Sequence, residues 1–143
     1  MLFDENGKGL CVIDLDTVMP GYFISDVGDM MRTYLPAVSE EEKDINKIEV
    51  REEYFLAIVR GYLREMSSEL SEDEIGHFVY SGLFMTYMQA IRFLADYLNN
   101  DAYYGAAYGQ QNHVRANNQI TLLQKLLDKE PWLNNKVMEV ARN

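Results

Sequence analysis

A mainly α-helical fold, opened by a short β-hairpin, is predicted by three features of this sequence. The turn sequence D-E-N-G at residues 4–7 separates two short apolar runs near the start of the chain. From residue 25 onward, apolar residues recur at three- and four-residue steps, which is the spacing of one helix face. An alternation of strands and helices, which a parallel sheet needs, is absent. We therefore expect one domain over 1–143, with the hairpin in 1–16 and a helical bundle in 25–141.

The predicted hairpin has a long second strand and a short first one. Asn6-Gly7 supplies the positive φ angles that a tight hairpin turn requires. The first strand is limited to residues 1–3, and the second is expected over residues 10–15. Two acids, Asp14 and Asp16, stand at the end of this second apolar run. Because side chains alternate along a strand, both carboxylates are expected on one face.

The helical part is predicted to begin just after the dipeptide Ser25-Asp26. An amphipathic pattern follows and stops before Pro36, and Asp26 is assigned a structural role as the residue that caps the helix N-terminus. The pattern S-x-x-E at 39–42 is typical of a capping box. It predicts a second helix that ends near Met66, with a break close to Asn46.

A second S-x-x-E pattern, at 71–74, predicts the start of a long helix over 72–98. The second half of this helix is apolar nearly all round, so we expect it to be the buried centre of the bundle. Residues 99–101 then interrupt the pattern, and a further helix is expected over 112–129. Pro131 is expected to begin a last short helix, because proline is favoured at a first helical position.

Charge and composition narrow the kinds of partner. Apolar residues make up 48% of the 143 residues and charged residues 25%, which is ordinary for a globular protein with its own core. The net charge of −10 argues against a nucleic acid or an anionic membrane as partner, because both attract clustered Lys and Arg. The single cysteine, Cys11, permits no internal disulfide and is expected to be buried. Asp4 and Glu5 interrupt any apolar leader, so a cytoplasmic location is expected.

Three chemistries use a pair of acids such as Asp14 and Asp16. The pair can bind a metal beside a transferred phosphate, or bind a sugar nucleotide through manganese. It can also act as a phosphoaspartyl nucleophile with its acid partner, because V-I-D-L-D-T-V at 12–18 resembles the motif of haloacid-dehalogenase-like phosphatases. In that third interpretation Asp14 is the nucleophile and Asp16 the general acid. The phosphatase chemistry needs a doubly wound parallel sheet, and the sugar-nucleotide site needs further strands, for which the residues after the motif offer no good candidates.

The flanking residues favour the first chemistry. C-V-I-D-L-D-T-V-M-P-G at 11–21 and D-V-G-D at 26–29 resemble segments of the aminoglycoside phosphotransferase and choline kinase-like family, and in particular its N-acetylhexosamine 1-kinase-like branch. R-F-L-A-D-Y-L at 92–98 and H-x-R-A-x-x-Q at 113–119 resemble later segments of that branch. The resemblance spans nearly the whole chain and implies the C-terminal lobe of a protein-kinase-like fold.

That resemblance implies ATP and Mg²⁺ as cofactors and a sugar as acceptor. Asp14 would hold Mg²⁺, with Asp16 as a second ligand or a support. Such a site is chemically reasonable, because Mg²⁺ takes oxygen ligands and usually needs only one or two protein carboxylates beside the phosphates. The catalytic H-x-D-x-x-x-x-N loop of the family does not occur in these 143 residues, and neither does its nucleotide-holding lobe. We therefore assign no catalytic residue and expect the chain alone to bind no cofactor and to show no kinase turnover.

The acceptor side of the predicted site is a polar stripe on the long helix. Gln89, Arg92 and Asp96 follow one another at three- and four-residue steps, so they share one face and are candidate sugar-binding residues. The competing interpretation is a solvent-facing stripe with an Arg92–Asp96 ion pair. His77, His113 and Arg115 are interpreted as structural, and the aromatic segment 103–108 is a further candidate for lining a sugar pocket.

Two functional hypotheses follow. The first is the C-terminal helical lobe of a sugar phosphotransferase of the N-acetylhexosamine type, which contributes the metal-binding acid and the acceptor helices. The second is a non-catalytic helical domain that binds a partner through an exposed apolar face. The same kind of face predicts self-association, because a lobe without its covering lobe leaves apolar surface uncovered.

Overall fold

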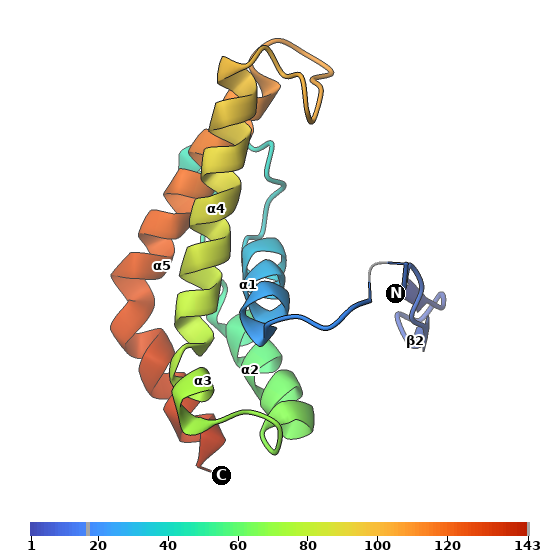
Figure 1. Ribbon diagram of the computed structural model, residues 1–143, viewed down its shortest axis with the longest axis vertical. Coiled ribbons are helices and arrows are strands. Elements are labelled where there is room, and N and C mark those ends of the chain that lie inside the picture. Colours follow the sequence, from blue (N-terminus) through green and yellow to red (C-terminus); the bar gives the residue numbers. More distant parts are fainter. Residues whose placement is uncertain (17, 143) are drawn as a thin grey trace.

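The computed structural model describes residues 1–16 and 18–142 and confirms a mainly α-helical fold that follows a short antiparallel hairpin. Five α-helices pack as a bundle (Figure 1). The elements in chain order are β1 (Leu2–Phe3), β2 (Gly9–Cys11), α1 (Phe23–Tyr34), the 3₁₀ turn η1 (Ile45–Lys47), α2 (Glu52–Met66), α3 (Glu72–Gly76), α4 (Phe78–Leu98) and α5 (Gln111–Ala141).

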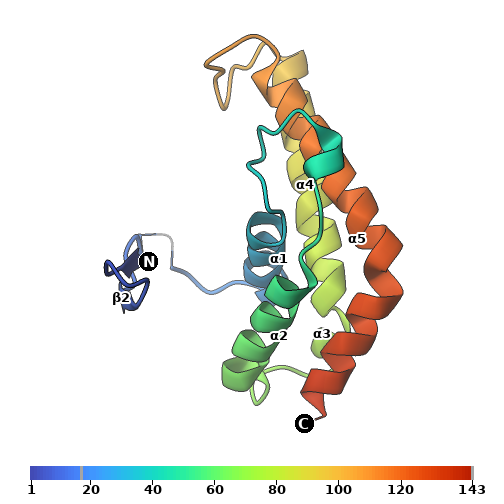
Figure 2. The same cartoon turned by 180° about the vertical axis from the view of Figure 1, so that it is seen from behind.

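Helices α4 and α5 form the long axis of the molecule and lie side by side along it (Figures 1 and 2). Helices α1 and α2 pack across their lower half, and the apolar core lies between these four helices. The core contains fully buried Phe55, Phe78, Leu122, Leu126 and Leu133. None of the helices in the described ranges combines the length and the apolar composition that crossing a bilayer requires.

Helices α1 and α4 approach so closely that only glycine fits at their crossing. A Cβ added to Gly28 would lie 2.3 Å from the carbonyl oxygen of Ser81 and 2.4 Å from Cγ of Met85. A Cβ added to Gly82 would lie 2.6 Å from Cε of Met31. The glycine of the D-V-G motif therefore has a packing reason, because it permits backbone contact between α1 and α4.

The predicted cap at Asp26 is wrong. Helix α1 begins four residues earlier than that cap implies, at Phe23, and Tyr22 precedes it without a capping side-chain bond. Asp26 is exposed in the first turn, where its charge is favourable near the positive end of the helix dipole. The sequence pattern missed the extra turn because Phe23 and Ile24, only half buried, add apolar contacts that the Ser25-Asp26 capping signal does not report.

The S-x-x-E pattern at 39–42 does not begin a helix. The Ser39 hydroxyl accepts a hydrogen bond from the backbone N–H of Glu41 at 3.2 Å, where a capping box would use the N–H of Glu42. The Glu42 N–H donates to the backbone oxygen of Ser39 at 3.0 Å, and the Glu42 carboxylate accepts from the backbone N–H of Asp44. Residues 36–44 form a bent connection that passes beside α5, and α2 begins only at Glu52. Arg51 anchors this connection, because its guanidinium donates to the backbone oxygens of Tyr34 and Pro36 at 2.8 and 3.0 Å.

The second capping box, at 71–74, is confirmed. The backbone N–H of Glu74 donates to the Ser71 hydroxyl at 3.3 Å, and the backbone N–H of Ser71 donates to the Glu74 carboxylate at 2.8 Å. The helix it opens is shorter than predicted, because a turn at His77 separates α3 from α4. Helix α4 is also not buried all round, since Tyr87 and Ile91 are exposed on one of its faces.

The break predicted at 99–101 is confirmed, and Asn100 and Asp101 both adopt positive φ angles there. The break predicted at Pro131 is wrong, because α5 continues through this proline to Ala141. Leu133 and Val137 are buried in the core beyond Pro131, and the ring of Trp132 packs 6.3 Å from that of Phe55. Packing on both sides of the proline offsets the backbone hydrogen bond that it removes.

The N-terminal arm, of which residues 1–16 and 18–22 are described, extends away from the bundle (Figures 1 and 2). Strand β2 ends at Cys11, four residues short of the predicted end, and pairs only with β1. Cys11 is exposed, so its predicted burial is wrong. The apolar run failed to predict burial here because the arm contributes no residue to the core. The exposed large apolar residues of the arm are Met1, Leu2, Phe3, Leu10, Val12, Ile13, Leu15, Val18, Met19 and Tyr22.

Candidate functional site

The acid pair lies on the connection that follows β2. Asp14 and Asp16 are both exposed, and neither is in a strand, so the predicted alternation onto one face does not apply. Asp14 adopts φ = 64°, a left-handed conformation that few residues other than glycine take and that aspartate tolerates better than most. Such outliers concentrate at functional sites. Within the described residues no group of three or more His, Cys, Asp or Glu side chains is placed to hold a metal, so this pair provides two carboxylates at most.

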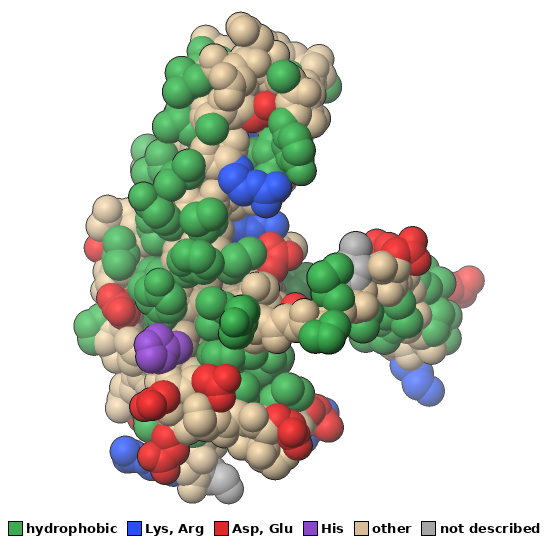
Figure 3. Space-filling model, in the orientation of Figure 1, with side chains coloured by type: hydrophobic (Ala, Val, Ile, Leu, Met, Phe, Trp, Pro, Cys, Tyr) green, Lys and Arg blue, Asp and Glu red, His purple; other side chains and the backbone are tan. Residues whose placement is uncertain are grey.

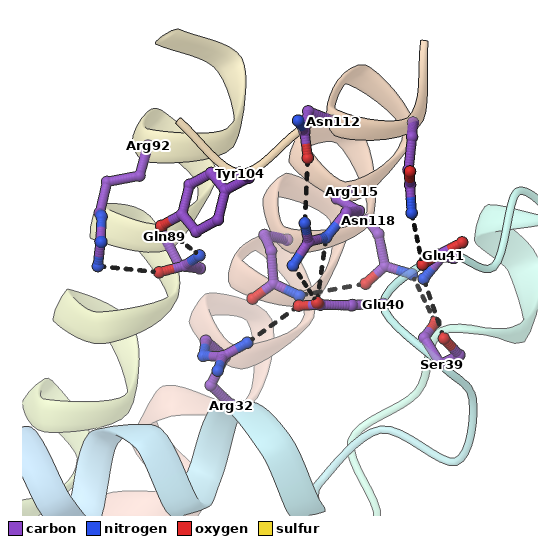
Figure 4. Close-up of polar contacts among 12 residues, drawn as sticks. Arg32, Ser39, Glu40, Glu41, Gln89, Arg92, Tyr104, Asn112, Arg115 and Asn118 are labelled. Carbon is purple, nitrogen blue, oxygen red and sulfur yellow. Dashed lines mark hydrogen bonds and ion pairs between the residues drawn. The ribbon is translucent and has the colours of Figure 1, made fainter. Parts of the chain in front are cut away.

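Two of the three predicted sugar-binding residues lie together at the upper end of α4. The Gln89 amide donates to the hydroxyl of Tyr104 at 3.2 Å, and Arg92 donates to the Gln89 oxygen at 3.5 Å (Figure 4). The Arg92 guanidinium carbon lies 5.5 Å from the centre of the Tyr104 ring and 5.9 Å from that of Tyr103. The aromatic segment after α4 therefore folds back over the polar stripe.

The third predicted residue, Asp96, has a different role. Its side chain is buried and its carboxylate accepts hydrogen bonds from the backbone N–H groups of Tyr103 and Tyr104, at 2.7 and 2.9 Å. It also accepts one from the Asn112 amide at 3.0 Å. The Arg92–Asp96 ion pair is not among the ion pairs of the described residues. Asp96 thus holds the 99–110 connection in place and is not available to a ligand, because a buried carboxylate is satisfied by these donors.

A charged network extends the site from Asn112 toward α1. Arg115 donates to the Glu40 carboxylate at 2.5 and 3.1 Å and to the Asn112 oxygen at 3.0 Å. The second Glu40 oxygen accepts from Arg32 at 3.2 Å, so one carboxylate joins α1 to α5 (Figure 4). The Arg115 guanidinium also stacks 3.7 Å from the Phe93 ring. Arg115 is therefore structural, as predicted.

The histidines are positioned by their neighbours. The ring of His77 contacts the backbone oxygen of Asp73 at 2.6 Å through Nδ1, and its edge meets the Tyr80 ring. The His113 ring lies 5.0 Å from that of Tyr97. Both arrangements agree with the structural roles predicted for these residues.

A cavity of about 270 Å³ opens beside this network. It lies between α1, the 36–40 connection and α5, and Arg32, Glu40, Asn118 and Gln119 are among the residues that line it. Gln119 is buried, and its side-chain oxygen has no hydrogen-bond partner in the described part of the chain. A buried amide oxygen without a donor is costly, so the rest of the fold must offset this unpaired group.

Sequence reasoning found Gln89 and Arg92 but missed the network residues Arg32, Glu40, Asn112 and Asn118. Asn118 donates to the backbone oxygens of Ser39 and Glu42 at 3.2 and 3.3 Å, and so fixes the 36–44 connection against α5. No periodicity joins residues this far apart in the sequence. A weak signal was present in the run of asparagine and glutamine in the first half of α5, because side-chain amides on a core-facing helix stripe need partners.

Amide, guanidinium and phenol groups from α4 and the 99–110 connection offer both hydrogen-bond donors and an aromatic surface. The acid pair lies apart from this polar group, on the arm (Figure 1). A scan against known protein families finds no family model that matches this chain.

Proposed function

We propose that this chain is the C-terminal helical lobe of an ATP-dependent sugar phosphotransferase of the aminoglycoside phosphotransferase and choline kinase-like family, with an acceptor of the N-acetylhexosamine type. In this proposal the hairpin and bundle correspond to the C-lobe of a protein-kinase-like fold. The observation that carries the proposal is Asp14, an exposed acid with φ = 64° on the connection after the hairpin. Asn100, Asp101 and Gln110 share this backbone state at turns, so what supports the proposal is its coincidence at Asp14 with the residue that the motif resemblance marks as the metal ligand.

The donor chemistry of the acid pair fits Mg²⁺. Asp14 and Asp16 offer carboxylate oxygens, which are the ligands that Mg²⁺ prefers, and both are exposed to solvent, so nucleotide phosphates and waters have room to complete six-fold coordination. Bound Mg²⁺ supplies charge neutralisation for the transferred phosphoryl group. Two carboxylates without phosphates form a weak site, so the chain alone is expected to bind Mg²⁺ only weakly.

The acceptor side is assigned to the upper end of α4. Gln89 and Arg92 present hydrogen-bonding groups, and Tyr104 holds Gln89 through its hydroxyl. The exposed ring of Tyr103 lies next to Arg92 and provides the flat apolar surface on which a sugar ring packs. Asp96 and Arg115 would not touch the sugar. They position the 99–110 connection and α5, which create this surface.

The packing of Gly28 gives the D-V-G resemblance a physical basis. The motif glycine lies where α1 meets α4, and it permits the close approach of these two helices. The proposal assigns neither a general base nor a nucleotide-holding lobe to residues 1–143, so turnover by this chain alone is not expected.

The first test is the coding sequence upstream of Met1. The proposal expects an in-frame H-x-D-x-x-x-x-N directly before it, and an in-frame stop codon there would contradict the proposal. In the enzyme extended by that segment, Asp14→Asn should lower kcat by roughly 10²–10³ with the fold retained, because the amide cannot neutralise Mg²⁺. Glu5→Gln, which changes an exposed acid on the same hairpin, is the matched control and should leave kcat unchanged.

The acceptor assignment has its own test in the same enzyme. Arg92→Ala should raise the KM for the sugar more than it changes kcat, because a binding contact is removed. Arg60→Ala, on α2, is the control. Equal KM values for Arg92→Ala and the parent enzyme would show that Gln89 and Arg92 do not bind the sugar.

A second function, a non-catalytic interaction domain, is favoured by one observation, the exposed apolar face of α4.

A further inference from the structure

Helix α4 carries a second apolar face, opposite the one that forms the core. Its members recur at three- and four-residue steps over nineteen residues of helix, a length of about 27 Å at 1.5 Å per residue. This face, here called the α4 stripe, consists of Tyr80, Phe84, Tyr87, Met88, Ile91, Leu94 and Leu98. Six of the seven are between 37% and 70% exposed, and Phe84 is half-buried.

The α4 stripe contains no charge. The only charged residues of α4 are Arg92 and Asp96, and both face elsewhere: Arg92 contacts Gln89 and the tyrosine rings, and Asp96 is buried against the 99–110 connection. Figure 3 shows hydrophobic side chains running along this side of the bundle. A long, continuous apolar face of this kind marks an interaction surface.

From these features we infer that the α4 stripe is the interface of a symmetric homodimer, in which α4 packs antiparallel against α4 of a second copy. A second copy presents the same uncharged stripe, so no charge is buried without a partner. A two-fold axis at the middle of the stripe, near Tyr87 and Ile91, makes the surface self-complementary and closes the assembly at two copies. Tyr80 and Leu98 then meet at the ends.

The available area is in the range that a stable dimer needs. The exposed side chains of the α4 stripe offer on the order of 600 Å² per copy, and a standard interface buries about 600–1,000 Å² of each partner. The charge of −10 on each copy works against association, so the apolar contact must overcome repulsion. Dimerisation should therefore strengthen as salt is added, because salt screens that repulsion. Arg92 and Tyr103 lie off the stripe, so the proposed acceptor site stays open, and this inference does not depend on the proposed function.

Sedimentation velocity of the full chain, over a range of protein and NaCl concentrations, tests the inference. The expected result is a reversible monomer–dimer equilibrium whose Kd falls as NaCl rises. Ile91→Glu should raise the Kd at least about tenfold, because it places a carboxylate at the two-fold axis. Ile45→Glu is the matched control: Ile45 is similarly exposed, at 52% against 42% for Ile91, but lies in η1 and should leave the Kd unchanged. Circular dichroism checks that both variants keep their helices.

A second measurement decides the question even if Ile91→Glu unfolds. In a Cys11→Ser background, Ile91→Cys should form a covalent dimer under mild oxidation, because residues beside a two-fold axis come within disulfide reach. Ile45→Cys should remain monomeric on a reducing-agent-free gel. A chain that stays monomeric at all concentrations, a dimer that persists unchanged in folded Ile91→Glu, or equal cross-linking at positions 45 and 91 would each overturn the inference.

Discussion

The N-terminal arm and the helical bundle of this chain are both rich in apolar residues, but these residues are exposed in the arm, whereas many of them are buried in the bundle. In the bundle, apolar side chains from α1, α2, α4 and α5 share one buried core. In the arm, the apolar residues from Leu2 to Tyr22 are exposed, and the two strands pair only with each other. A two-stranded hairpin is marginal on its own. The comparison teaches that apolar content predicts burial only where the chain supplies a second surface at the right distance.

Matched leucine truncations should show the largest difference between the two regions. Leu126→Ala removes a fully buried side chain of α5 and should lower the free energy of unfolding by about 2–5 kcal/mol, because it leaves a cavity. Leu10→Ala removes a side chain that is 63% exposed in the arm and should change that free energy by less than about 0.5 kcal/mol. Urea unfolding followed by circular dichroism measures both. A loss of more than 2 kcal/mol in Leu10→Ala would mean that the arm packs on the bundle.

Two glycine substitutions test how closely α1 and α4 pack in the bundle. Gly28→Ala should destabilise the fold by about 3 kcal/mol, because the added Cβ would lie 2.3 Å from the Ser81 oxygen and would push α1 from α4. Gly61→Ala, in α2, meets nothing within 4 Å and should stabilise by about 0.5–1 kcal/mol through its higher helix propensity. Thermal unfolding of the two variants should therefore shift in opposite directions, and shifts of the same sign would refute the close crossing of α1 and α4.

The connection above the bundle depends on one carboxylate. Asp96→Asn should lower the local unfolding free energy of the 99–110 connection by about 2 kcal/mol. The reason is that the Asn NH₂ group would face the backbone N–H of Tyr103 or Tyr104, and two donors cannot form a hydrogen bond. Hydrogen exchange of these two amides should accelerate, while that of Leu126 in α5 should change little. Asp101→Asn is the comparison variant, because Asp101 accepts only the Asn112 amide there. Unchanged protection of Tyr103 and Tyr104 in Asp96→Asn would return Asp96 to the list of ligand-binding candidates.

The smallest expected effect is a pH dependence at the start of α3. The backbone N–H of Ser71 bonds to the Glu74 carboxylate and lowers its pKa below the usual 4.5. A carboxyl group with a lowered folded-state pKa contributes stability above its unfolded-state pKa, and that contribution is lost as pH falls through the folded value. Wild type should therefore exceed Glu74→Gln in stability at pH 7, and the gap should close by about pH 3. A gap that is constant with pH would show that the capping bond does not depend on charge.

Much of the fold was predictable because its signals are local. Three of these signals are the hairpin turn at 4–7, the Ser71 capping box and the break at Asn100 and Asp101. In the hairpin turn only Gly7 takes the positive φ that was predicted for both Asn6 and Gly7. The failures come from long-range contacts. Ser39 does not begin the predicted helix because Asn118, which is distant in sequence, donates to the backbone oxygens of Ser39 and Glu42 and fixes the 36–44 connection against α5. Pro131 stayed inside α5 because residues beyond it pack in the core.

The candidate site divides in the same way. The three-residue spacing of Gln89 and Arg92 on a helix predicted that they share one face, and in the structure the two side chains are in contact. The same spacing rule placed Asp96 on that stripe but could not report its burial, which depends on the conformation of the 99–110 connection. The network through Glu40 joins α1 to α5 across 75 positions and has no local signal. The left-handed backbone of Asp14 is likewise invisible in a pattern that predicts a strand.

The central claim is that the helical bundle is stable through its own core, whereas the acid-bearing arm is stabilised only by its own hairpin contacts. Native-state hydrogen exchange tests this claim most directly, at a protein concentration where the chain is monomeric. Amides of Phe93 and Leu122 should exchange only through global unfolding, at the free energy that urea titration gives. The amide of Cys11, in the hairpin ladder, should exchange close to its unprotected rate. Protection of Cys11 equal to that of Phe93 would contradict the account.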